Sequence, residues 1–176
     1  TIFLLRDWPL ILDRFLSYIT LNILQSNKMC GIAGIFSQSV LTSDSQTDMH
    51  FMVEALNHRG PNAKGIKMLD QSRLAFGHTR LSILDLSALG LQPMQSCSKN
   101  LTITFNGEIY NHLELRQELS KEKNIQWKSS TDTETLLECI DHFGIKKTLS
   151  KLKGMFAFGL WDDKRKKLFL CRDRFG

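Results

Sequence analysis

Cys30 is the residue best placed for chemistry in this sequence, because it could become the first residue of the chain. It directly follows Met29, the first methionine of the sequence. Removal of Met29 would leave a thiol and a free α-amino group on one residue. An α-amine with a pKa of about 7.7–8.0 is partly neutral near physiological pH and can take the thiol proton. Cys30 would then supply both nucleophile and general base.

The residues after Cys30 suit such a site. The sequence Gly-Ile-Ala-Gly-Ile-Phe at 31–36 is small and apolar, which is typical of a buried strand, and its glycines leave space for a substrate. A buried structural cysteine at the start of a strand is the other interpretation. The downstream residues decide between the two.

Arg80 is the candidate for binding an anion. It lies among apolar residues in a predicted strand over 74–84, and an arginine cannot lose its charge in a core. It is therefore either a surface residue or a ligand for an anion such as a carboxylate, which its planar guanidinium fits. His78, in the same strand, is interpreted as a structural histidine.

Asn106 and Gly107 follow a predicted strand over 101–105. An Asn-Gly pair is the usual signal of a tight turn. At a strand end, the Asn side-chain amide and a following backbone N–H can also converge on one point, and Gly leaves that N–H open. Such a pair could form an oxyanion hole.

Two further segments allow a structural and a functional interpretation. Thr131 or Asp132 could cap a predicted helix that ends at Gly144, or the carboxylate could bind an ammonium group. His58-Arg59-Gly60-Pro61 could simply end a helix and turn the chain, or it could hold Arg59 near the active site.

The remaining elements are predicted from periodicity. Apolar spacing indicates a helix over 48–57 that is capped by Asp48, and a helix over 111–121 that is capped by Asn111. Alternation at 101–105 and strand-like apolar composition elsewhere predict strands. They cover 63–69, 74–84, 101–105, 125–128, 154–161 and 168–172, with the charged run 164–167 as a solvated hairpin turn.

Composition describes a globular chain. With 176 residues, 42% hydrophobic and 23% charged, it is expected to fold as one domain. The net charge of +5 is scattered, which argues against nucleic-acid binding. The four cysteines lie far apart without metal-ligand spacing, which favours a reducing compartment, hence the cytoplasm. The apolar run at 15–24 is too short to span a membrane.

Seven segments in order resemble the glutaminase domain of glutamine-hydrolysing asparagine synthetases, which are type 2 glutamine amidotransferases. They are C-G-I-A-G-I-F, H-R-G-P, H-T-R-L-S-I, N-G-E-I-Y-N-H, S-S-T-D-T-E, G-M-F-A-F and R-D-R-F-G. The resemblance covers residues 30–176 and implies an α+β fold, a four-layer αββα sandwich of the N-terminal-nucleophile hydrolase type. Asn62 stands where many members have Asp.

The resemblance also implies the site. Cys30 would be the nucleophile, Asn106 and Gly107 the oxyanion hole, Arg80 the ligand of the α-carboxylate, and Glu108 and Asp132 neighbours of the α-amino group. No residue is expected to bind metal. The implied substrate-binding residues are Arg80, Leu81, Ser82, Ile83, Leu84, Asn106, Gly107, Glu108 and Asp132.

The implied reaction is hydrolysis of L-glutamine to glutamate and ammonia through a Cys30 thioester. The family then uses the ammonia to amidate aspartate in a synthetase domain that needs ATP and Mg²⁺. We expect residues 30–176 to lack that domain and to need no cofactor themselves. A homodimer stays open, and binding to nucleic acid or membrane is not expected.

Residues 1–28 have three interpretations: upstream translation, an amphipathic extension or a targeting segment. We expect them to be absent from the mature protein. If they are retained, the domain would be an inactive glutamine-binding or scaffolding module. A third alternative is an amidase of the same type that acts on another amide; Arg80 with Glu108 and Asp132 argues against it.

Overall fold

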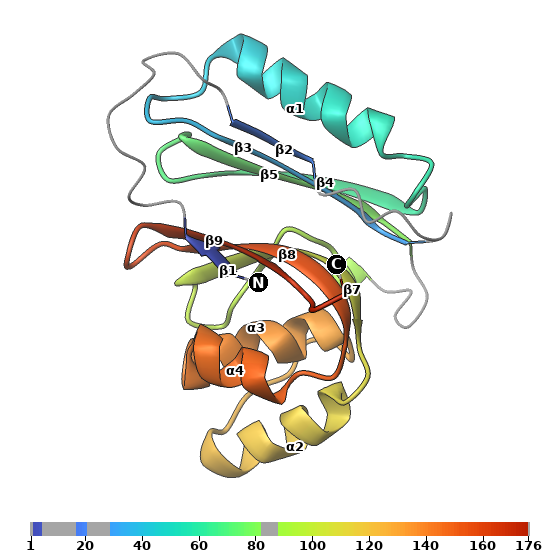
Figure 1. Cartoon of the computed structure of the whole chain (residues 1–176), viewed down its shortest axis with the longest axis vertical. Coiled ribbons are helices and arrows are strands. Elements are labelled where there is room, and N and C mark those ends of the chain that lie inside the picture. Colours follow the sequence, from blue (N-terminus) through green and yellow to red (C-terminus); the bar gives the residue numbers. More distant parts are fainter. Residues whose placement is uncertain (1, 5–16, 21–28, 82–87, 176) are drawn as a thin grey trace.

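The protein is a stack of four layers (Figure 1). The computed structural model describes residues 29–81 and 88–175, and the backbone alone of 2–4 and 17–20. One helix covers the first sheet, a second sheet lies against the other face of the first, and three helices cover the outer face of the second sheet. The predicted αββα sandwich is thereby confirmed.

The first sheet has the order β2-β3-β5-β4, and every neighbouring pair is antiparallel. Its strands are β2 (Ser17–Thr20), β3 (Gly31–Phe36), β4 (Ala63–Leu69) and β5 (Leu74–Arg80). Helix α1 (Ser43–Ala55) packs on it through the buried side chains of Met49 and Val53. All seven residues of β5 are buried, because the strand lies between α1 and the second sheet.

The second sheet has the order β1-β9-β8-β7-β6. Its strands are β1 (Ile2–Leu4), β6 (Met94–Gln95), β7 (Leu101–Ile109), β8 (Gly154–Asp162) and β9 (Lys167–Arg172). Its outer face carries α2 (His112–Glu122), α3 (Asp132–Phe143) and α4 (Ile145–Lys151). A short 3₁₀ helix, η1 (Ala88–Gly90), precedes β6.

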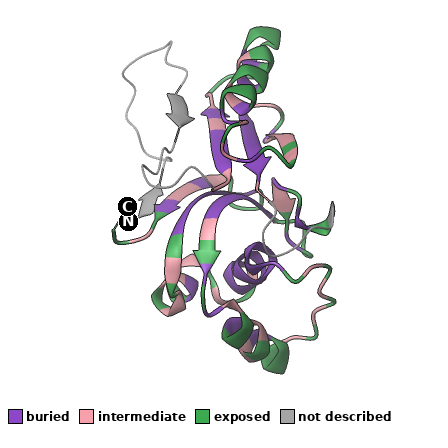
Figure 2. Cartoon of the chain, turned by 90° about the vertical axis from the view of Figure 1, so that its right-hand side faces the viewer, coloured by how far each residue is buried: buried purple, intermediate pink, exposed green. Residues whose placement is uncertain are grey.

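The two sheets are joined by apolar and polar contacts. Leu74 and Phe76 of β5 pack against Trp161 and Leu168 of the second sheet. Figure 2 shows the buried residues concentrated on the strands and on the inner faces of the helices. Close to one end, the Thr104 hydroxyl donates to the Gly77 carbonyl at 3.1 Å across the sheets. These contacts fix one sheet against the other beside the candidate site.

Five local predictions need correction. Helix α1 begins at Ser43 rather than at 48, because the Thr42 side chain caps it by accepting from Ser45 N. Asn106 and Gly107 form no turn: β7 continues to Ile109, since β8 pairs with it over its whole length.

Residues 125–128 are not a strand, because they find no partner strand within the described chain. The predicted strand over 74–84 ends at Arg80, and its last residues fall outside the described ones. Asn111 does precede α2, yet its side chain bonds Lys151 O and Lys153 N instead of capping the helix.

The cysteines Cys30, Cys97, Cys139 and Cys171 form no disulfide. Among the described residues, no helix is long and apolar enough to cross a membrane.

Candidate active site

Cys30 directly precedes β3, and two other segments contact it. The Leu81 N–H, just past the end of β5, donates to the Cys30 sulfur at 3.3 Å, and the thiol lies 3.8 Å from the Leu81 carbonyl oxygen. The Arg59 Nε donates to the Cys30 carbonyl at 3.3 Å. The turn at 58–61 therefore both ends the helix region and brings Arg59 to the site, as the functional interpretation predicted.

The backbone after Cys30 is held equally firmly. Gly31 N–H donates to the Thr79 hydroxyl at 3.1 Å, and that hydroxyl donates to the Leu56 carbonyl at 3.1 Å. A Cβ at Gly31 would lie 2.5 Å from the Thr79 hydroxyl oxygen. A larger residue would not fit there without displacing this hydroxyl. Gly31 therefore packs closely between the end of α1 and β5.

Burial raises the pKa of the Cys30 thiol above its ordinary value, while the Leu81 hydrogen bond and the positive charge of Arg80 oppose this shift. The thiol therefore stays protonated at neutral pH. A nucleophilic role needs a nearby base that removes the proton.

Arg80 is buried beside the start of α3. Its exposed fraction is 7%, and Gly90 makes room for its guanidinium: a Cβ on Gly90 would lie 2.8 Å from Arg80 Cζ and 3.2 Å from Thr131 Cγ2. Arg80 thus reaches from β5 toward Thr131 at the end of the second sheet. This is the buried arrangement expected for an anion ligand, and it excludes the alternative of a surface arginine.

Asn106 and Gly107 lie in β7, opposite Ala157 and Phe156 of β8. Asn106 is 2% exposed, and its Oδ1 has no hydrogen-bond partner among the described residues. Gly107 has φ +150°, and a Cβ there would lie 2.6 Å from the Phe156 Cα. The backbone is therefore specific to glycine at this point, but for a reason other than the predicted turn.

Asp132 is the first residue of α3, and the cap of that helix is Thr131, whose hydroxyl accepts from Glu134 N at 3.2 Å. The Asp132 carboxylate instead accepts from Ile109 N at 2.9 Å. Burial raises the pKa of Asp132, and the negative charge of Glu108 adds to the shift. Glu108 is exposed. Glu108 and Asp132 thus place two negative charges near this end of β7.

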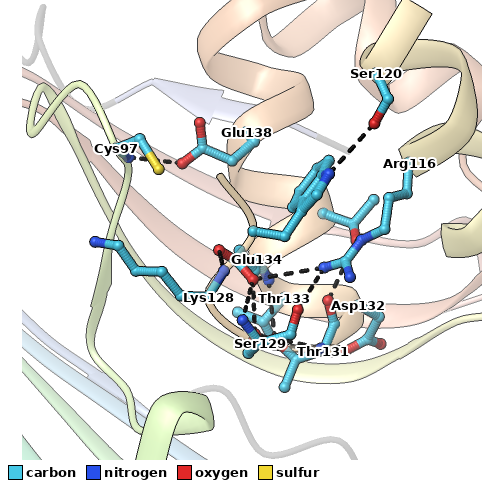
Figure 3. Close-up of polar contacts among 12 residues, drawn as sticks. Cys97, Arg116, Ser120, Lys128, Ser129, Thr131, Asp132, Thr133, Glu134 and Glu138 are labelled. Atoms are coloured by element: carbon cyan, nitrogen blue, oxygen red, sulfur yellow. Dashed lines mark hydrogen bonds and ion pairs between the residues drawn. The ribbon is translucent and has the colours of Figure 1, made fainter. Parts of the chain in front are cut away.

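A partly buried polar network around the buried Glu134 fixes the loop before α3 (Figure 3). Glu134 accepts from the backbone N–H groups of Lys128 and Ser129, at 2.9 and 2.8 Å, and from the Ser129 hydroxyl at 2.8 Å. Arg116 reaches the same carboxylate at 3.5 Å and lies over the Trp127 ring at 4.1 Å. The network holds the chain that leads directly into Thr131 and Asp132.

His78 is structural, as predicted. It is 1% exposed, and burial lowers its pKa to about 4, so the ring is neutral at physiological pH. Its Nε2 lies 3.2 Å from the Phe105 carbonyl oxygen, which can only accept, so Nε2 carries the proton.

The structure thus brings Cys30, Leu81, Arg80 and Asp132 to one end of the two sheets, with Asn106 and Gly107 on the adjoining strand. Ser82, Ile83 and Leu84, which the resemblance places in the substrate site, lie outside the described residues. Sequence reasoning missed Gly90 and Gln92, because nothing local distinguishes either from an ordinary loop residue. Among the described residues, no cluster of metal-ligating side chains occurs.

Comparison with known proteins identifies a family model for the glutamine amidotransferase domain that matches residues 29–176. Asparagine synthetase [glutamine-hydrolyzing] 1 of Bacillus subtilis is 39% identical over 150 residues, with 84% of this chain and 23% of that protein covered. The amidase chry2 of Gibberella zeae is 32% identical over 157 residues, with 84% and 23% covered. The chain spans about a quarter of the length of these relatives.

Among solved structures, the glutamine phosphoribosylpyrophosphate amidotransferase of B. subtilis superimposes with a TM-score of 0.60 at 23% identity, covering 77% of this chain and 35% of that one. At this identity the match supports the fold. It agrees with the layered sandwich described above.

Proposed function

The chain belongs to the glutamine amidotransferase domain family, and from this premise we propose that it hydrolyses L-glutamine to glutamate and ammonia through Cys30. The observation that carries the proposal is the position of the Cys30 sulfur, which accepts from Leu81 N–H next to the buried Arg80. A nucleophile beside a buried cation and a pair of carboxylates suits a free amino acid with an amide side chain.

The substrate is held at its two charged groups in this proposal. The Arg80 guanidinium binds the α-carboxylate, since its planar fork matches a carboxylate. Asp132 and Glu108 bind the α-ammonium group. The amide carbon then lies at the Cys30 sulfur, with its oxygen toward the Asn106 side chain and Gly107 N–H.

The base is the α-amino group of Cys30, which exists once residues 1–29 are removed. The amine takes the thiol proton, and the thiolate attacks the amide carbon. The resulting oxyanion is stabilised by donors from Asn106 and Gly107. Proton transfer from the ammonium to the amide nitrogen expels ammonia and leaves a thioester. Water, deprotonated by the amine, then cleaves the thioester to glutamate and restores the thiol.

We further propose that the ammonia serves a synthetase domain that needs ATP and Mg²⁺ and amidates aspartate. The names of the B. subtilis relatives, which are much longer than this chain, support this part. The unbridged cysteines suit a reducing compartment, and we propose the cytoplasm.

The test is a glutamate and ammonia assay on protein that begins at Cys30. We expect release of both products in equal amounts, and loss of release in Cys30→Ala. Cys97→Ala is the matched control, because Cys97 is a free, exposed cysteine that the proposal gives no role. Release from Cys30→Ala would refute the nucleophile. The fungal amidase relatives make a different amide the second candidate, and cleavage of asparagine or a simple amide in place of glutamine would favour it.

A further inference from the structure

We call Asn106–Gly107–Glu108 the oxyanion segment. The backbone N–H groups of Phe105, just before it, and Ile109, just after it, are hydrogen-bonded by side chains. On the β8 side the strand is paired throughout, but on the other side β6 pairs only with Ile103 and Thr102. Beyond that point the edge of β7 has no partner strand in the described chain. A buried edge must satisfy its N–H and C=O groups with side chains instead.

Gln92 supplies the first of these side chains. Its Oε1 accepts from Phe105 N–H at 2.6 Å, immediately before the oxyanion segment. Because an N–H can only donate, this bond fixes the orientation of the Gln92 amide and leaves Nε2 as a donor. The Phe105 carbonyl on the same edge is bound by His78 at 3.2 Å.

From Gln92 a chain of polar contacts leads to the other end of the segment. Gln92 Nε2 donates to the Thr133 hydroxyl at 3.3 Å, and that hydroxyl lies 3.5 Å from the nearer Asp132 carboxylate oxygen. The other oxygen of Asp132 accepts from Ile109 N at 2.9 Å. The chain therefore begins and ends on β7, on either side of the oxyanion segment.

All three side chains are shielded from water. Gln92 is 7% exposed, Thr133 is 4% and Asp132 is 6%. Water cannot easily replace a missing partner here, and each bond has a fixed direction. Among the described contacts between Phe105 and Ile109, the Gln92 amide is the group that both accepts from β7 and donates toward α3.

We propose that Gln92 is a positioning residue for glutamine hydrolysis. It fixes the position of the oxyanion segment relative to Asp132, whose carboxylate binds the α-ammonium group of the substrate in the proposed function. This inference rests on the proposed function. Gln92 itself touches no substrate. It acts through Phe105 and Thr133, so its loss misplaces the oxyanion donors while Arg80, which lies on another strand, still binds the α-carboxylate.

The first test is Gln92→Leu, which keeps the approximate size and removes both bonds. We expect kcat for glutaminase to fall at least about tenfold, because small errors in donor placement are costly, while KM changes less than about threefold. Gln95→Leu is the matched control. Gln95 lies on β6, only three residues away, and is exposed; its side chain donates to the Lys99 carbonyl. The Gln95→Leu variant should have the kcat of wild type.

The second test is Gln92→Glu, which separates positioning from simple packing. A protonated Glu accepts from Phe105 N–H and donates to Thr133, as Gln does, whereas an ionised Glu can only accept. Burial and the nearby Asp132 raise the pKa of such a carboxyl. The ratio of variant to wild-type kcat should therefore rise as the pH falls from about 8.5 to about 5.5.

Circular dichroism at the assay temperature checks that each variant is folded. If folded Gln92→Leu keeps the wild-type kcat, or if the Gln92→Glu ratio is the same at every pH, the inference is wrong. If wild-type protein that begins at Cys30 releases no glutamate at all, the proposed function fails first. The two failures are therefore distinguishable.

Discussion

The Cys30 sulfur lies 3.3 Å from the backbone nitrogen of Leu81, two residues that are 51 positions apart in sequence. Antiparallel pairing of β3 with β5 sets this distance, since Gly31 lies opposite Thr79. Cys30 and the end of β5 that carries Arg80 are therefore placed by one register.

Alkylation should report the protonation of Cys30. Burial raises the pKa of its thiol, so little thiolate exists at neutral pH while residue 29 is attached. We expect iodoacetamide to modify Cys30 slowly at pH 7 and faster as the pH rises. Peptide mass spectrometry separates this reaction from that of Cys97. A rate at Cys30 that does not depend on pH would contradict the raised pKa.

Gly90→Ala should weaken glutamine binding without touching the nucleophile. The new Cβ would lie 2.8 Å from Arg80 Cζ, so the buried guanidinium has to move. We expect KM for glutamine to rise about tenfold, which corresponds to a loss of roughly 1.4 kcal/mol in binding free energy. Gly34→Ala is the control, because its nearest neighbour atom lies at an ordinary 3.6 Å. Equal KM values for both variants would contradict the claim that Gly90 fixes the position of the Arg80 guanidinium.

Asp132→Asn should stabilise the domain and weaken glutamine binding. Burial raises the pKa of Asp132, so ionisation costs folding free energy once the pH exceeds the ordinary Asp pKa of about 3.9. Asn still accepts from Ile109 N–H and removes that cost. We expect a higher melting temperature than wild type at pH 7, an advantage that disappears toward pH 4, and a higher KM for glutamine.

Asp163 is the opposite case and serves as control. The Lys166 hydrogen bond holds the pKa of Asp163 below its ordinary value. Its carboxylate contributes stability above the ordinary Asp pKa and loses that contribution as the pH falls through the lowered one. Asp163→Asn should therefore melt below wild type at pH 7. A lower melting temperature for Asp132→Asn at pH 7 would contradict the assigned cost.

Glu134→Ala should destabilise the domain. The substitution leaves two backbone N–H groups, the Ser129 hydroxyl and the Arg116 charge without their shared partner. We expect a loss of about 3 kcal/mol in the free energy of unfolding, measured by urea denaturation. Exposed Glu114→Ala should change it by less than about 0.5 kcal/mol. Equal stabilities of the two variants would show that the network in Figure 3 carries little energy.

Sequence patterns found the elements that local physics determines. A strand is predicted at 63–69, where β4 lies, and the helical spacing of Leu136, Leu137 and Ile140 locates α3, whose residues Asp132 to Ile140 are all buried. The Asn106-Gly107 pair misled, since a turn signal is local and the pairing of β7 with β8 overrides it. The order of the four layers came from the family resemblance.

Part of the site could not be predicted from the sequence. Cys30, Arg80 and Asp132 stand out because a reactive or charged residue in an apolar context needs an explanation. Gln92 and Gly90 do not, since one acts through a bond to distant Phe105 and the other through the absence of a side chain. Such roles depend on contacts between segments far apart in the sequence.

The most direct measurement compares glutamate release by two purified forms, one that begins at Cys30 and one that keeps residues 1–29, with each N-terminus verified by intact mass. We expect turnover by the first form and none by the second, because only a free amine on Cys30 can act as the proposed base. Equal turnover by both forms would contradict it.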